Sequence, residues 1–217
     1  MFSLVFSRRF AMAHRLISGG SEKCAVPHGH NEVITVVLRA ARSSPLDAAP
    51  NMLEPFERAE ATWHRWIDGH VDHALQLSAE DPLLAWFVSY ESRRLDRILM
   101  TPGDPTTELL ACCMMAKLNA FLDAEGGRLT CAEIRIEETP TNMVLFSGNP
   151  ISFLPASDRP VPWWQRPDMS INDLEHSDSM RIRTPCQRAG EIPQKWASKI
   201  PHLVSDCQCI LLIFAEN

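Results

Sequence analysis

Apolar and polar residues alternate with a period of two in two stretches near the start of the chain, at residues 2–7 and 28–39. Alternation of this kind is typical of a β-strand with one buried face. The second stretch also contains the β-branched run 33–37, which favours a strand. Two glycines and a proline lie between the stretches, at 17–27, so we expect them to form a long antiparallel hairpin.

Helical spacing of apolar residues follows in the middle of the chain. A helix is predicted after Asn51, which suits an N-cap, with Pro55 in its first turn. A second helix is predicted over about 107–124 and ends at Gly126, and the apolar stretch 81–90 predicts a short helix between them. The apolar face of the first helix consists of Phe56, Ala59, Trp63, Ile67 and Val71.

Alternation returns at 128–138 and at 143–147, with a turn between these stretches. The order strand, strand, helix, helix, strand, strand predicts an α+β domain with an antiparallel sheet. Prolines become frequent from 148 on, and the last residues, 209–215, have a strand-like pattern. We therefore expect a domain at 1–147 and a C-terminal extension of unknown role at 148–217.

Composition and charge narrow the classes of function. The chain has 217 residues, of which 45% are hydrophobic and 22% charged, as in a globular protein, and its net charge is -6. A nucleic-acid partner is not expected, because binding phosphates requires a basic face. No apolar stretch has the length of a membrane span, so no membrane partner is expected either. Seven cysteines, an odd number, favour reduced thiols and a cytoplasmic location.

The most informative stretch contains three histidines and a cysteine. His28 and His30 are two residues apart on a predicted strand and so share a face, and His14 ends the partner strand. Three imidazoles with a fourth position open are typical of a catalytic zinc site, although exposed strand histidines are the alternative. Cys24 lies in the loop between the strands, where a nearby cation would lower its pKa. It could bind the metal, act as a base, or be an inert loop cysteine.

Three further groups carry weaker signals. Asp72 precedes His73, and a carboxylate can orient an imidazole, although such pairs are common on surfaces. Thr106 and Thr107 precede a predicted helix, where capping alone accounts for them. Glu138 follows the apolar face of its strand and could accept paired N–H groups of a heterocycle, or be an exposed strand end.

Taken together, these residues resemble the 6-pyruvoyl-tetrahydropterin synthase and 6-carboxytetrahydropterin synthase family. The resemblance extends over about residues 1–147. The most specific part of the resemblance is the cysteine that precedes a His-Gly-His triplet, together with the Ala-His pair upstream. The matching pieces, in chain order, are Phe10–His14, Cys24–His30, Asp72-His73, Pro105–Glu108 and Glu138-Thr139.

The resemblance implies a tunnelling fold, in which each subunit contributes a four-stranded antiparallel sheet and two helices. Subunits of this family join edge to edge into an oligomeric β-barrel, usually a trimer or a hexamer, with active sites between them. The expected partners are therefore a small pterin triphosphate substrate and further copies of the same chain. The expected roles are zinc ligands for His14, His28 and His30, catalysis for Cys24, Asp72 and His73, and substrate binding for Glu138, Thr106 and Thr107.

The implied substrate is 7,8-dihydroneopterin triphosphate, and the implied cofactor is Zn²⁺. Only three residues separate the cysteine from the His-Gly-His triplet, which resembles the carboxy-forming branch of the family. We therefore expect a 6-carboxy-5,6,7,8-tetrahydropterin synthase that releases acetaldehyde and triphosphate on the route to queuosine. The alternatives are a 6-pyruvoyl-tetrahydropterin synthase and a non-catalytic pterin-binding assembly protein. Arg15 and Lys23 are either phosphate contacts or solvated loop charges.

Overall fold

The structure, a computed structural model, describes residues 2–20, 22–41, 46, 51–155 and 161–174. The strand predicted at 209–215 lies outside these residues. In the described part of the chain, no helix is both long and apolar enough to cross a membrane.

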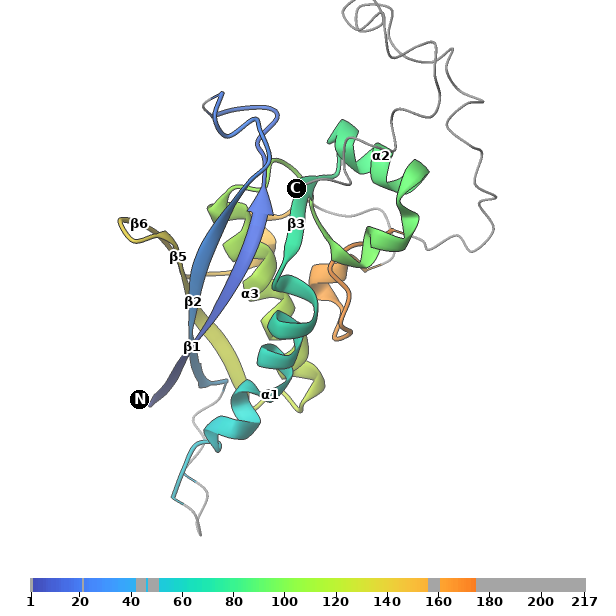
Figure 1. Cartoon of the computed structure of the whole chain (residues 1–217). Helices are drawn as coiled ribbons and strands as arrows, with labels where there is room; N and C mark the ends of the chain where they lie inside the picture. Colours follow the sequence, from blue (N-terminus) through green and yellow to red (C-terminus); the bar gives the residue numbers. More distant parts are fainter. Residues whose placement is uncertain (1, 21, 42–45, 47–50, 156–160, 175–217) are drawn as a thin grey trace, which may run out of the picture. The chain divides into compact units, whose positions relative to one another are not determined.

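Four antiparallel strands form the main part of the sheet, as predicted. β1 (Ser3–His14) pairs along its whole length with β2 (His28–Ala40), and β5 (Leu129–Thr139) pairs with β2 on its other side. β6 (Asn142–Phe146) pairs back on β5 through a short turn. The predicted hairpin and the α+β class are confirmed. The pairing places the end of β1, the start of β2 and the end of β5 next to one another (Figure 1).

Two short strands that the sequence pattern did not predict extend the sheet beyond β1. β3 (Ala74–Ser78) pairs in parallel with the last residues of β1, and β4 (Ile98–Thr101) pairs in parallel with β3. The sheet therefore has six strands in the order β4-β3-β1-β2-β5-β6. Between β3 and β4 lie the short helix α2 (Pro82–Tyr90), close to the predicted 81–90, and a 3₁₀-helical segment (Ser92–Arg97).

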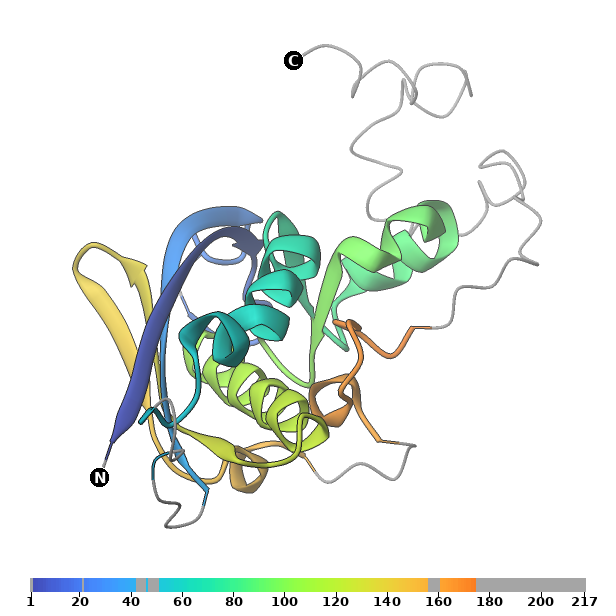
Figure 2. The ribbon, with the colours of Figure 1, turned by 90° about the horizontal axis from the view of Figure 1, so that it is seen from below.

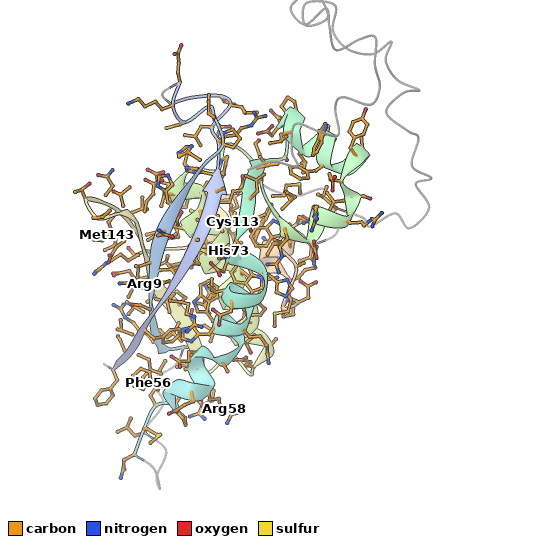
Figure 3. The ribbon with its side chains drawn as sticks, in the orientation of Figure 1. Arg9, Phe56, Arg58, His73, Cys113 and Met143 are labelled. Carbon is orange, nitrogen blue, oxygen red and sulfur yellow. The ribbon has the colours of Figure 1, made fainter. Side chains whose placement is uncertain are left out.

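The longer helices cover one face of the curled sheet (Figure 2). They are α1 (Phe56–Trp66), which continues into a π-helical turn (Ile67–Val71), and α3 (Thr107–Ala124). Trp63 and Trp66 are fully buried between these helices and the sheet. The prediction that Asn51 caps α1 is wrong, because Pro55 is the N-cap and Asn51 lies upstream with a positive φ of 51°. Phe56, expected on the buried face, is 49% exposed because it begins the first turn (Figure 3).

The described residues that follow β6 pack onto the core. They form two 3₁₀ turns, Pro150–Phe153 and Trp163–Gln165, and belong to the same compact unit as the sheet. In the 161–174 segment, the backbone carbonyl of Ile171 accepts a hydrogen bond of 3.0 Å from Met100 N–H at the edge of β4. The Trp163 indole is fully buried and donates to the Met100 carbonyl at 2.8 Å. The first part of the expected extension therefore completes the core.

Candidate active site

A cavity of about 530 Å³ lies where β1, β2, β5 and β6 meet the start of α3. It contains the metal-ligand candidates, the candidate thiol and the candidate substrate-binding residues from four separate stretches of the chain. Cys24 is half-buried there, whereas Cys112, Cys113 and Cys131 are buried elsewhere. The predicted site residues that line this cavity are His14, His28, His30, Cys24, Thr106, Thr107 and Glu138.

The three histidines converge because of strand register. His14 and His28 are directly opposite each other on β1 and β2, and His30 follows on the same face of β2. The Nε2 atoms of His14 and His28 are 3.1 Å apart. One nitrogen from each of the three rings lies within 4.8 Å of the others.

Backbone carbonyls hold two of these rings in one tautomer. The Nδ1–H of His14 donates to the Pro105 carbonyl at 2.9 Å, and the Nδ1–H of His28 donates to the Val26 carbonyl at 2.9 Å. Burial lowers the pKa of His14, and the neighbouring His28 and His30 lower it further, although the Pro105 carbonyl opposes this. In a neutral ring with a protonated Nδ1, the Nε2 carries a lone pair. When both rings are neutral, the Nε2 lone pairs of His14 and His28 therefore face each other.

This arrangement fits a divalent metal ion. Two lone pairs that face each other repel unless a cation lies between them. Two nitrogen ligands of a tetrahedral zinc, each about 2.0–2.1 Å from the metal, lie about 3.3 Å apart, close to the 3.1 Å between the Nε2 atoms. Outer hydrogen bonds from the other ring nitrogen are typical of metal-binding histidines. Three imidazoles and an open cavity leave room for a fourth ligand.

The thiol candidate is set apart from the other described cysteines by its surroundings. Burial raises the pKa of the Cys113 thiol far above its usual range and that of Cys131 to about 12, so neither is a reactive thiolate at neutral pH. Cys24 instead lies in the loop between β1 and β2 and lines the cavity. Its backbone carbonyl accepts a hydrogen bond of 2.8 Å from Leu16 N–H, which closes this loop on itself.

The substrate-binding candidates are connected to one another. The Thr107 hydroxyl donates to Glu138 Oε1 at 2.9 Å, joining the start of α3 to the end of β5. Thr106 is the N-cap of α3, and its side chain accepts from Leu109 N–H at 3.3 Å. Glu138 therefore has one carboxylate oxygen fixed by Thr107, while the residue lines the cavity.

A second acid lies close to this group and was not singled out by the sequence. Glu32 is two residues beyond His30 on β2 and is only 4% exposed. Burial, with a contribution from the nearby charge of Glu138, raises the pKa of Glu32 to about 8. Its Oε2 has no hydrogen-bond partner within the described residues. The sequence pattern does not indicate such a buried acid, because the alternation along the strand predicts only that position 32 faces inward.

Asp72 and His73 do not join the other candidates. They lie beside Ala11 on β1, and His73 is labelled in Figure 3. Neither residue lines the cavity. Asp72 accepts from Ala11 N–H at 2.7 Å and from His73 Nδ1 at 2.8 Å. Burial raises the pKa of Asp72, but these two hydrogen bonds, together with charge interactions that include Arg97, outweigh this effect and lower the pKa below its usual value. The His73 side chain is 78% exposed, and its φ of 64° is unusual for a residue other than glycine.

Comparison with known proteins agrees with this geometry. A family model described as 6-pyruvoyl tetrahydropterin synthase matches residues 3–149, about two thirds of the chain. The chain belongs to this family. Its members are lyases that act on pterins.

Individual relatives are more distant. The chain is 26% identical over 135 residues to proteins named 6-carboxy-5,6,7,8-tetrahydropterin synthase from Rickettsia felis and Rickettsia bellii. In each case the match covers 62% of this chain and 92% of the relative. Among solved structures, an uncharacterised protein from Wolinella succinogenes is similar with a TM-score of 0.54 and 16% identity, over 68% of this chain and 98% of that one. This likeness confirms the tunnelling fold of the single chain.

Proposed function

We propose that this family member is a zinc-dependent 6-carboxy-5,6,7,8-tetrahydropterin synthase. It would convert 7,8-dihydroneopterin triphosphate to carboxytetrahydropterin, acetaldehyde and triphosphate, on the route to queuosine. The observation that carries the proposal is the convergence of three imidazoles in one cavity that Cys24 and Glu138 also line. The three-residue gap between Cys24 and His28 and the names of the Rickettsia relatives support the carboxy product.

The family resemblance implies a role for each residue, and the position of the residue supports that role. His14, His28 and His30 would hold the zinc, which as a Lewis acid would polarise the side-chain oxygens of the substrate. Glu138, oriented by Thr107, would accept paired N–H groups of the pterin ring in the same cavity. Cys24 would take up a proton from the substrate side chain.

The relay of Asp72 and His73 would come from a neighbouring subunit. Within the described residues, β3 pairs only with Met12–His14 of β1, so the rest of this β1 edge has no strand beside it. β6 is the last strand at the other edge of the sheet, and its residues 142–144 line the cavity. If the β1 edge of one chain paired with β6 of another, the Asp72-His73 pair beside Ala11 would approach the second chain's cavity. These features support a homo-oligomer closed by its sheet edges.

The test is the product of the full-length, zinc-loaded protein with 7,8-dihydroneopterin triphosphate, identified by mass spectrometry. Carboxytetrahydropterin with acetaldehyde is expected, and Cys24→Ala should lose at least about 100-fold in kcat while keeping its zinc. Cys112→Ala, a change outside the cavity, is the matched control and should turn over normally. A pyruvoyl product would refute the carboxy assignment, and retention of pterin without turnover would indicate a binding protein.

Mixing two inactive variants tests whether subunits share the site. Cys24→Ala and His73→Ala are purified separately, then dissociated and reassembled together. If His73 acts on the cavity of its neighbour, mixed oligomers contain some intact sites and regain a substantial fraction of wild-type kcat. Activity that stays at the level of the separate variants would place both groups in one chain's site, or show that His73 has another role.

A further inference from the structure

Along the chain, the segment from Ala79 to Asp104 lies between the Asp72-His73 pair and the start of α3. The family resemblance gives this segment no role. It contains α2, the Ser92–Arg97 turn and β4. Two acidic residues from this segment contact the loop that carries Cys24, one from each end of the segment. The segment therefore bears on the candidate site through this loop.

The first contact is an ion pair at the start of the loop. The Arg15 guanidinium, directly after the metal-ligand candidate His14, makes two hydrogen bonds to the carboxylate of Asp81, with Nε to Oδ2 at 2.8 Å. The Asp81 side chain is fully buried, and it also caps α2 by accepting from Leu83 N–H at 2.7 Å. Hydrogen bonding to Asp81 raises the pKa of Arg15 despite its burial. Arg15 is thereby engaged in an ion pair within the protein.

The second contact is made by Asp104. Its Oδ1 accepts from Ile17 N–H at 3.0 Å, and its Oδ2 accepts from Ser18 N–H at 2.7 Å. Between Arg15 and Ile17, the backbone N–H of Leu16 donates to the Cys24 carbonyl. The residues on both sides of Leu16 are therefore anchored to the 79–104 segment, and Leu16 itself is bonded to Cys24.

The residue directly after this segment contacts one of the metal-ligand candidates. Pro105, next to Asp104, accepts the hydrogen bond from His14 Nδ1. Asp104 is itself held against the next turn, because its carbonyl accepts from Thr106 N–H at 2.7 Å. One short stretch thus fixes the Cys24 loop, the His14 ring and the N-cap of α3 relative to one another.

We propose that Asp104 and the Arg15–Asp81 ion pair are positioning residues that hold Cys24 over the three-histidine cluster. The 79–104 segment serves the site as the support for this loop. Neither group touches the reacting atoms; each acts through the backbone of residues 15–18. The proposal rests on the function proposed above, in which Cys24 transfers a proton. A misplacement of about 1 Å can lower a rate about 100-fold, so fixing this loop has a direct effect on catalysis.

The main test compares Asp104→Asn with Asp96→Asn in the full-length, zinc-loaded protein. The asparagine side chain keeps the shape of the aspartate, but its NH₂ group cannot accept the second backbone amide. Asp96 is an exposed residue of the same segment, so its substitution removes the same charge without touching the loop. Arg15→Lys, which keeps the charge but not the paired hydrogen bonds, is compared in the same way with Arg94→Lys at an exposed surface pair.

Two readouts are needed. Hydrogen exchange of the Ile17 and Ser18 amides should accelerate at least 10-fold in Asp104→Asn and stay unchanged in Asp96→Asn. The kcat should fall at least 10-fold, with KM within twofold of wild type and one zinc per chain retained, because the pterin-binding residues are untouched. Arg15→Lys should show the same pattern.

The possible failures are distinguishable. Unchanged exchange in Asp104→Asn overturns the proposal. Faster exchange with an unchanged kcat also overturns it, because the contact would then be merely structural. If the wild-type protein shows no turnover, the proposed function fails, while faster exchange in Asp104→Asn still supports the anchoring of the Cys24 loop.

Discussion

Replacing the buried Lys117 by methionine tests how the 161–174 segment is held to the core. The Lys117 side chain is fully buried in α3, and its ammonium donates to the Trp163 carbonyl at 3.0 Å and to Asp168 Oδ1 at 3.1 Å. Burial lowers the pKa of Lys117 to about 8, although Asp168 opposes this. The other titratable groups near the ammonium are Arg166 and Asp173 on the 161–174 segment, and His70.

The magnitude follows from the two pKa values. The usual value is 10.5 and the folded value about 8, a difference equivalent to about 3.4 kcal/mol at about 1.36 kcal/mol per pKa unit. Below pH 8 both the folded and the unfolded chain carry the proton, and the folded state bears this full cost. Between about pH 8 and 10.5 only the unfolded chain keeps the proton, so the free energy of unfolding rises with pH.

Lys117→Met removes both the cost and its pH dependence. The gain of about 3.4 kcal/mol at pH 7 already includes the interaction with Asp168. The lost hydrogen bond to the Trp163 carbonyl offsets it by about 1.5–3 kcal/mol, so the variant should be more stable by up to about 2 kcal/mol. The difference between wild type and variant should shift by about 3 kcal/mol in favour of the wild type between pH 7.5 and 10.5.

Urea unfolding across this pH range, followed by tryptophan fluorescence, measures the difference. Trp66 and Trp163 stack on each other, and the Lys117 ammonium is 5.9 Å from each ring centroid, so their fluorescence reports the local structure. Lys23→Met, at an exposed lysine, is the control and should show no such shift. A wild-type-minus-Lys117→Met difference that stays constant from pH 7.5 to 10.5 would refute the argument, because Lys117 would then titrate alike in both states.

Four further substitutions test the site and the core. Glu138→Gln should raise KM for the pterin about 10–100-fold in steady-state kinetics, because a charged acceptor is lost. Thr107→Val should raise KM only about fivefold. Equal KM values for these two variants would contradict the contact between Glu138 and the pterin. Thr106→Ala should lower the free energy of unfolding by about 1 kcal/mol in urea titration, and no loss would mean that the cap is dispensable. Trp163→Ala should lower it by about 3–5 kcal/mol, compared with little change for the exposed Trp86→Ala, and similar losses for both would be inconsistent with the core packing.

The metal-ligand candidates could be predicted because strand geometry is local. The period of two places His28 and His30 on one face, and an antiparallel partner that ends at His14 must bring its last residue beside the start of β2. Helix α3 could also be bounded closely, because its cap and its terminating glycine are both local signals.

The two short strands could not be predicted from the pattern. β3 has five residues and β4 has four, and most of them are buried, so neither shows alternation. The parallel pairing of β3 depends on β1, which lies about 60 residues earlier in the chain, and β4 pairs in turn with β3. Short apolar runs of this kind are ambiguous between strand and buried helix.

The supports of the Cys24 loop also lack a sequence signal. Arg15 and Asp81 are 66 residues apart, and Ile17 and Asp104 are 87 apart, so only the fold brings them together. Asp104 accepts from backbone amides, so the identities of Ile17 and Ser18 do not indicate this contact. The same holds for Glu32, whose raised pKa depends on its neighbours in the folded sheet.

The way the 161–174 segment covers β4 determines which fragments of this protein can be studied alone. A fragment ending at residue 149 would keep the whole region that the family model matches, yet it would leave the Met100 amide and carbonyl without the partners they have in the full chain. It would also open the fully buried Trp66 and Lys117 to water. Fragments for crystallisation or binding studies should therefore extend to residue 174, and a shorter one is expected to aggregate through the newly exposed edge of β4.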